Sequence, residues 1–357
     1  MNLYFLFIDL AIVAFISNYI NIKKLDGIIS IFIIIILSLF FGFREGLVLS
    51  TDLPHYRDMY NSMTDNFEEF NFGRIELLFG YYIILLKKMS LSDNLFIIST
   101  SILFHILLIL AIFKFFRRKA LLLILIVSTP VYFNYASNTI REGIAFALFF
   151  LFAFSLNKKI FKYIILSVFG TLIHSSFIFS AILLWMSSKI NISLISFIAL
   201  FVISLFFFII DVNSLIFSFL LWIPQVGALE RTITYALEID DNVGTRKFLY
   251  LSSIILVILN FYYKDRILKK LSDNNEINIH FYNSLISFIA IALLFYPILS
   301  QYGYLIRLFG YVFFLTPILL YGLVYSLFNK TISSILIFIY IVITYSYYVY
   351  ISNILLV

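Results

Sequence analysis

The sequence contains no cysteine and few charged residues. Without cysteine, the chain has no disulfides, no thiolate metal sites and no cysteine nucleophile. Charged residues make up only 12% of the chain and hydrophobic residues 63%, whereas soluble domains have about 25% charged and about 45–50% apolar residues. This composition excludes an ordinary soluble globular protein and predicts one that crosses the bilayer several times.

The charge and the histidines give no sign of nucleic-acid or metal binding. The net charge is +6, but the basic residues lie in short clusters between apolar runs, where they mark membrane topology. The histidines are scattered, without the i, i+4 spacing of a helical metal site; they are His55, His105, His174 and His280. We expect no nucleic-acid partner, no bound transition metal and no cofactor.

Apolar runs of transmembrane or nearly transmembrane length recur along the whole chain. They lie at Asn2–Ile20, Ile28–Phe43, Leu95–Ile112, Ala120–Tyr135, Arg141–Leu156, Ile192–Ile210, Phe248–Tyr263, Phe281–Ser300, Tyr304–Leu327 and Ile332–Ile351. We predict an all-α, polytopic membrane protein with about twelve transmembrane helices, some short or broken, and external amphipathic loops. Residues 1–357 then form a single integral membrane domain.

The positive-inside rule decides two ambiguous stretches. The lysines of 158–162 and the basic cluster of 264–270 both belong in the cytoplasm, so an even number of crossings must separate them. Residues 160–187 are therefore predicted to form a hairpin of two short helices broken near His174. By the same rule, Ile75–Leu86 is a re-entrant or interfacial segment.

This topology places Lys87 and Lys88 outside, against the rule, and makes both termini external. It also brings several polar residues to the external face, a result that did not enter the charge count. They are Arg44, Asp52, Arg141, His174 and Arg307. The external loop 213–246 contains an apolar stretch, Leu215–Ile223, which suits a lid on the bilayer surface.

Arginines are the candidate anion-binding groups. Arg141 begins an apolar helix after the polar residues Asn138 and Thr139, and it either snorkels to the headgroups or lines a polar pocket. Its planar fork suits phosphate oxygens, so we assign it to a pyrophosphate. Arg307, which has apolar neighbours and no nearby acid, receives the same role. Arg44 either ends the second span or supplies supporting charge.

Two residues compete for the role of general base. His174 is either a structural histidine at a helix break or a neutral imidazole that accepts a hydroxyl proton. Asp52 is either an N-cap ahead of Pro54 or the base itself. An apolar setting favours a neutral imidazole over a charged carboxylate, so His174 is the first choice and Asp52 the alternative.

Tyrosines are the candidate sugar-binding groups. Ser300-Gln301-Tyr302-Gly303-Tyr304 lies between two spans, where the rings either anchor the protein at the interface or stack on sugars. We take Tyr302 as the candidate in this cluster, and Tyr56, in the loop after Asp52, as a second candidate.

Five motifs together resemble one family. Asp52 followed by Tyr56 and Tyr60 looks like the "G-D-x-x-x-Y-x-x-x-Y" loop of EpsG-like proteins, which are exopolysaccharide and O-antigen polymerases of the Wzy type. Glu76-Leu77-Leu78-Phe79 resembles their "E-x-x-F", and Ile140-Arg141-Glu142-Gly143-Ile144-Ala145 their "I-R-Q-G-I-A". Leu172 to Ser176 resembles "F-H-x-S", and Arg307 with Tyr311 resembles "R-x-x-x-Y". The motifs occur in the same order as in the family.

The resemblance implies a metal-independent membrane glycosyltransferase on the outer face of the bacterial plasma membrane, which makes O-antigen, capsule or exopolysaccharide. Such an enzyme transfers a growing glycan from undecaprenyl pyrophosphate to the non-reducing end of a lipid-linked repeat unit. Its expected partners are lipid-linked oligosaccharides, the bilayer and a chain-length regulator. Two alternatives stay open, a flippase of lipid-linked oligosaccharides and a membrane O-acyltransferase.

Overall fold

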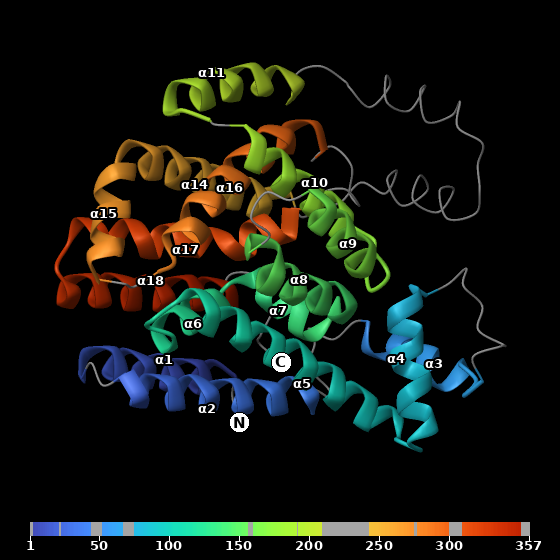
Figure 1. The fold of residues 1–357 in the computed structure, drawn as a ribbon. Coiled ribbons are helices and arrows are strands. Elements are labelled where there is room, and N and C mark those ends of the chain that lie inside the picture. The colour runs from blue at the N-terminus through green and yellow to red at the C-terminus, as the bar shows by residue number, and fades with distance from the viewer. Residues whose placement is uncertain are drawn as a thin grey trace, which may run out of the picture.

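The fold is known from a computed structural model, which describes residues 3–20, 23–43, 52–66, 75–155, 160–190, 192–208, 243–274, 277–299 and 309–350. Over these residues the chain is helical (Figure 1). The helices are α1 (Leu3–Ile20), α2 (Lys23–Gly42), α3 (Leu53–Ser62), α4 (Leu77–Lys88), α5 (Asp93–Phe115), α6 (Ala120–Val127), α7 (Pro130–Ser137), α8 (Ile140–Phe152), α9 (Ile160–Thr171), α10 (Ser176–Lys189), α11 (Leu194–Leu205), α14 (Val243–Tyr262), α15 (Lys264–Asn274), α16 (Ile279–Leu299), α17 (Gly310–Leu327) and α18 (Lys330–Tyr350).

The helices confirm an all-α, polytopic membrane protein. Within the described ranges, five helices are long and apolar enough to cross a membrane, and the bent pair α6–α7 makes a sixth if counted as one span. Shorter apolar helices accompany them, among them α1, α9, α10 and α11. The number of twelve crossings stays a prediction.

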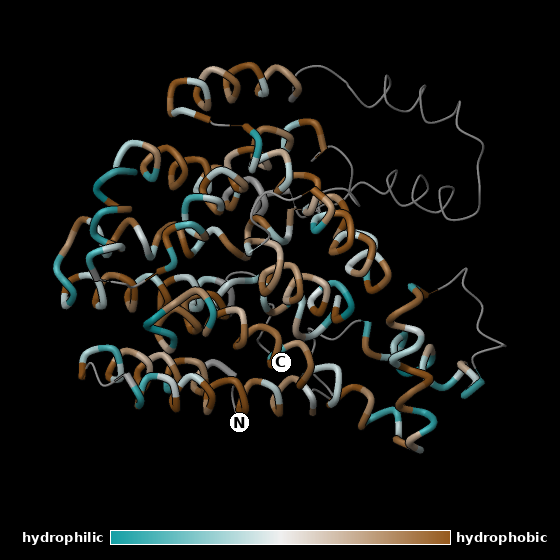
Figure 2. The backbone as a smooth tube through the Cα atoms, in the orientation of Figure 1, coloured by the Kyte–Doolittle hydropathy of each residue, from teal (hydrophilic) through white to brown (hydrophobic). Residues whose placement is uncertain are grey.

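Apolar surface covers the middle of the bundle, and polar segments lie at its ends. Large hydrophobic side chains are exposed on the outer helices, for example Phe5, Phe161 and Ile195, as expected for residues that face lipid. Figure 2 shows hydrophilic segments at α15 on one side and around α3 and the ends of α4 on the other. α5 connects the two sides and packs against α2 and α8.

The expected span Ala120–Tyr135 is broken into two helices. The chain bends by 80° between α6 and α7. Pro130 occupies the first turn of α7, where a backbone N–H would have no partner within the helix, so its absence costs nothing. The Thr129 hydroxyl accepts a hydrogen bond from the Tyr132 N–H at 3.3 Å and so caps α7. A new helix start in the middle of an apolar run turns the chain toward α8.

The hairpin predicted for residues 160–187 is confirmed. α9 ends at Thr171 and α10 begins at Ser176, so the break contains His174. Tyr163 near the start of α9 interacts with Ser188 near the end of α10, which fits two antiparallel helices. α4 covers most of the predicted interfacial segment Ile75–Leu86. It runs across the direction of α5, near the first residues of α5 (Figure 1).

Two helices were not anticipated from the sequence. α3 contains the start of the acidic loop, and α15 contains the basic cluster of 264–270. Each is short and amphipathic, so neither forms an apolar run of transmembrane length. α15 packs against the end of α17, where Lys270 Nζ donates to the Phe328 carbonyl at 2.8 Å.

Candidate functional site

The α7–α8 junction positions Arg141. The Asn134 carbonyl accepts hydrogen bonds from the Asn138 and Thr139 N–H groups, each at 2.9 Å, and the Asn134 amide donates to the Thr139 hydroxyl at 3.1 Å. At Gly143 the two helices approach so closely that a Cβ would lie 2.9 Å from the Tyr135 carbonyl oxygen. The polar residues before Arg141 and the glycine after it therefore hold this arginine in the first turn of α8.

The Arg141 guanidinium is paired with Glu76. Arg141 Nη1 lies 2.5 Å from Glu76 Oε2, and the two side chains are only 21% and 22% exposed. The guanidinium also lies 5.9 Å from the centre of the Tyr56 ring and 5.8 Å from that of Phe79, within the range of cation–π attraction. Its Nε is buried and has no hydrogen-bond partner among the described residues. Glu76 and the two rings thus fix the orientation of the guanidinium, and its Nε–H remains as a donor for a ligand.

α3 brings Asp52 and Tyr56 to this arginine. Asp52 is the N-cap residue of α3, with Pro54 in the first turn, but its carboxylate makes no capping hydrogen bond. Tyr56 is buried. Burial raises the pKa of Tyr56, the nearby Arg141 charge opposes that rise, and Asp52 adds to it. Asp52, Tyr56 and Arg141 are therefore close enough for their charges to interact.

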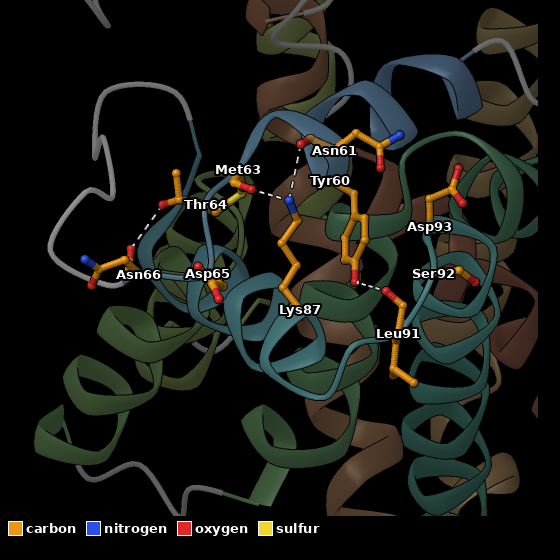
Figure 3. Close-up of a pocket in the computed structure, with 10 residues that line it drawn as sticks. All are labelled: Tyr60, Asn61, Met63, Thr64, Asp65, Asn66, Lys87, Leu91, Ser92 and Asp93. Atoms are coloured by element: carbon orange, nitrogen blue, oxygen red, sulfur yellow. Dashed lines mark hydrogen bonds between the residues drawn. The ribbon is translucent and has the colours of Figure 1, made fainter.

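A lysine and a tyrosine fix α3 in place (Figure 3). Lys87 Nζ donates to the carbonyls of Met63, just after α3, and of Asn61, the latter at 3.2 Å. The Tyr60 hydroxyl donates to the Leu91 carbonyl at 2.6 Å. A cation at the carboxyl end of a helix interacts favourably with the helix dipole. This role gives Lys87 a structural reason to lie at this end of the bundle.

The break that contains His174 lies against the start of α4. The Leu78 N–H donates to the Leu172 carbonyl at 2.8 Å, so this break adjoins the helix turn that follows Glu76. His174 is partly buried, and its Nδ1 lies 2.8 Å from the Ser176 hydroxyl and 3.3 Å from the Ser176 N–H. Residues far apart in sequence therefore meet around the first turns of α3, α4 and α8.

A buried acid lies behind Arg141 on the same helix. Glu142 is 3% exposed, and it accepts a hydrogen bond from the Tyr135 hydroxyl at 3.4 Å. Tyr311 on α17 is fully buried and close enough to interact with both Glu142 and Ser176. Tyr311 therefore lies between Glu142 and Ser176, whose hydroxyl contacts His174.

The group formed by Asp52, Tyr56, Arg141 and His174, which we call the Arg141 cluster, lies at the end of the bundle opposite the basic clusters. Lys114 at the end of α5 donates to the Leu151 carbonyl near the end of α8 at 2.9 Å. With a rise of about 1.5 Å per residue, α8 places Arg141 about 15 Å from Leu151 along its axis. The segment after α5 also pairs with Ile277, which follows α15. The basic segments 114–119 and 264–270 therefore lie at one end, and Arg141 lies at the other.

Comparison with known proteins settles the family. The EpsG family matches residues 27–354, nearly the whole chain. The chain belongs to the EpsG family. Membership supports a polysaccharide polymerase of the glycosyltransferase type. No curated protein and no solved structure matches the chain.

The structure of this EpsG-family chain gathers four of the seven site residues named from the sequence. Arg141, Tyr56 and Asp52 lie together, and His174 adjoins them through the Leu78–Leu172 contact. Arg44, Tyr302 and Arg307, and the loop 213–246, lie outside the described residues. Within the described ranges, no three His, Asp or Glu side chains are grouped to hold a metal ion.

Sequence reasoning missed the partners of the named residues. The sequence marks Glu76 only as part of a motif, although an acid at the start of an apolar helix is a usable signal. Glu142 was seen only as a departure from a family glutamine. A carboxylate at a position that the helix buries requires hydrogen-bond partners, but the sequence does not reveal that Tyr135 and Tyr311 are next to it.

Proposed function

We propose that this protein polymerises a bacterial surface polysaccharide on the external face of the plasma membrane. It would transfer a growing glycan from undecaprenyl pyrophosphate to the non-reducing end of a lipid-linked repeat unit. The observation that carries the proposal is the Arg141 guanidinium. Glu76 and two aromatic rings hold it in place, and its Nε has no hydrogen-bond partner within the described part of the chain. Its position opposite the basic clusters supports an external site.

The proposed step breaks the bond between the anomeric carbon and the pyrophosphate oxygen. The electron pair leaves with the pyrophosphate, and the acceptor hydroxyl forms the new glycosidic bond. Its proton passes to a base, His174 or Asp52. Arg141 stabilises the charge that develops on the leaving group, in a setting where fixed donors act more strongly than in water.

The proposed mechanism uses no metal ion, since arginines supply the positive charge. Arg307 would bind the pyrophosphate with Arg141, and Arg44 would add charge. Tyr56 and Tyr302 would contact the sugars, and a chain-length regulator would bind the same protein in the membrane. Transfer that continues unchanged with a chelator supports this account, and activity restored only by added divalent cations contradicts it.

The experiment is a transfer assay with purified protein and a synthetic undecaprenyl-pyrophosphate-linked repeat unit. The proposal predicts a ladder of products that grows by whole repeats, with release of one undecaprenyl pyrophosphate for each linkage formed. A flippase would move the repeat unit across proteoliposomes without lengthening it. An O-acyltransferase would require an acyl donor and would leave the glycan length unchanged.

A further inference from the structure

The hydrogen bonds of His174 indicate which ring nitrogen carries the proton. The Ser176 N–H points at Nδ1 from 3.3 Å, and the Ser176 hydroxyl lies 2.8 Å from the same atom. A backbone N–H can only donate, so Nδ1 must present its lone pair to it. In the neutral ring the proton then lies on Nε2, since the hydrogen bond at one nitrogen selects the tautomer.

The surroundings of Ser176 are compatible with this assignment. Ser176 is 5% exposed and Tyr311 is fully buried. The Tyr311 hydroxyl interacts with Ser176, although it makes no hydrogen bond of standard geometry among the described residues. When the Ser176 hydroxyl donates a hydrogen bond to Nδ1, its oxygen can accept a hydrogen bond from the Tyr311 hydroxyl. In that arrangement the Tyr311 hydroxyl donates to Ser176, and the Ser176 hydroxyl donates to His174.

Glu142 is a second acceptor near Tyr311. An ionised carboxylate only accepts hydrogen bonds, and Glu142 already accepts one from Tyr135 at 3.4 Å. It lies close enough to Tyr311 to interact with it. Tyr311 has a single O–H and can donate it to only one of these two acceptors, and the Ser176 proton is left for Nδ1 when Tyr311 donates to Ser176. If Nδ1 carried the proton instead, its N–H and the Ser176 N–H would face each other.

Asp52, by contrast, has a carboxylate that does not cap its own helix. It is partly buried and lies near the buried Tyr56, which contacts Arg141. Its oxygens can therefore accept a proton from a hydroxyl bound next to the pyrophosphate. His174 in its inferred tautomer has no basic nitrogen to offer, because Nδ1 is engaged and Nε2 is protonated.

We infer that His174 serves as a hydrogen-bond donor, through Nε2–H, to a phosphate oxygen of the lipid-linked substrate, and that Asp52 is the base. The inference rests on the proposed glycan transfer and reverses the order of preference drawn from the sequence. Ser176 and Tyr311 are positioning residues, which act by holding Nδ1 as an acceptor. Arg141 and the imidazole then give the leaving group one charged and one neutral donor.

The decisive comparison is His174→Gln against His174→Ala in the transfer assay. Glutamine places an amide N–H near the position of Nε2 but contains no basic nitrogen. His174→Gln should stay within about tenfold of the parent, and His174→Ala should lose about 100-fold or more, as expected when a donor to the developing charge is removed. Asp52→Asn should be as inactive as His174→Ala. Glutamine as inactive as alanine, with Asp52→Asn active, would overturn the inference.

A spectroscopic measurement decides the tautomer even if the variants fold poorly. The protein with ¹⁵N-labelled histidine contains four imidazoles, and the His174→Gln spectrum identifies the signals of His174. Nitrogen shifts of an Nε2–H imidazole support the inference, and those of an Nδ1–H imidazole refute it. This readout needs no substrate. If the parent protein transfers no glycan, the proposed function fails, whereas the tautomer result stands by itself.

Discussion

The two ends of the bundle use buried charge in different ways. At the basic end, Asp26 accepts hydrogen bonds from the backbone N–H groups of Lys119 and Ala120, at 2.7 and 3.3 Å, and so caps α6 from another helix. At the opposite end, Arg141 pairs with a side chain, Glu76, and retains an Nε without a partner among the described residues.

We interpret this difference as one between a charge that serves the fold and a charge that is kept for a ligand. A carboxylate that accepts backbone N–H groups satisfies the exposed donors of a helix start, so its role is complete within the fold. An arginine held by another side chain and two rings is oriented but not saturated. In an apolar protein, where each buried charge is costly, spare donor capacity indicates a ligand.

The largest expected effect comes from Arg141→Lys. Lysine keeps the charge but loses the planar fork and cannot hold Glu76 and a phosphate together. Transfer should fall by about 100-fold or more, as for the loss of one donor to a developing oxyanion. The measurement is product length and rate in the purified assay, at equal amounts of inserted protein.

Arg118→Lys is the matched control for Arg141→Lys. Arg118 also lies over a tyrosine ring, 5.5 Å from the centre of Tyr325, and donates to Asn18 at 3.4 Å, but at the basic end. Its lysine variant should make product of nearly parental length. Equal losses in the two variants would show that the comparison between the two ends is mistaken.

A smaller effect is expected for Glu76→Gln. Glutamine still accepts a hydrogen bond from Arg141 but carries no charge, and the weaker bond should lower kcat/KM about tenfold, equivalent to about 1.4 kcal/mol. In the Arg141→Lys background the same change should add little, because the two residues act as a unit. Fully additive losses would indicate that Glu76 acts independently of Arg141.

The smallest effect on transfer is expected for Asp26→Asn, which should instead change stability. Loss of the charge that caps α6 should lower the free energy of unfolding by about 1–2 kcal/mol. The expected observation is a lower Tm in detergent, with normal transfer per folded molecule. A catalytic loss at an unchanged Tm would assign Asp26 a functional role that this account denies.

The sequence predicts the long apolar helices and the hairpin at His174, because apolar length and lysine placement are properties of single segments. It does not predict the bend at Thr129, since the apolar run continues through it. α3 and α15 are hidden because their amphipathic turns are too polar for a span. The Arg141–Glu76 pair depends on how α4 meets α8, which no local pattern encodes.

An external Arg141 site requires that the two ends of the bundle face opposite sides of the membrane. The chain has no native cysteine, and Ser175 and Lys269 are exposed at the two ends. In intact cells, an impermeant thiol reagent should label Ser175→Cys from outside, and it should label Lys269→Cys only after the membrane is permeabilised. Labelling of Lys269→Cys from outside, with Ser175→Cys protected until permeabilisation, would place the Arg141 cluster in the cytoplasm and contradict the account.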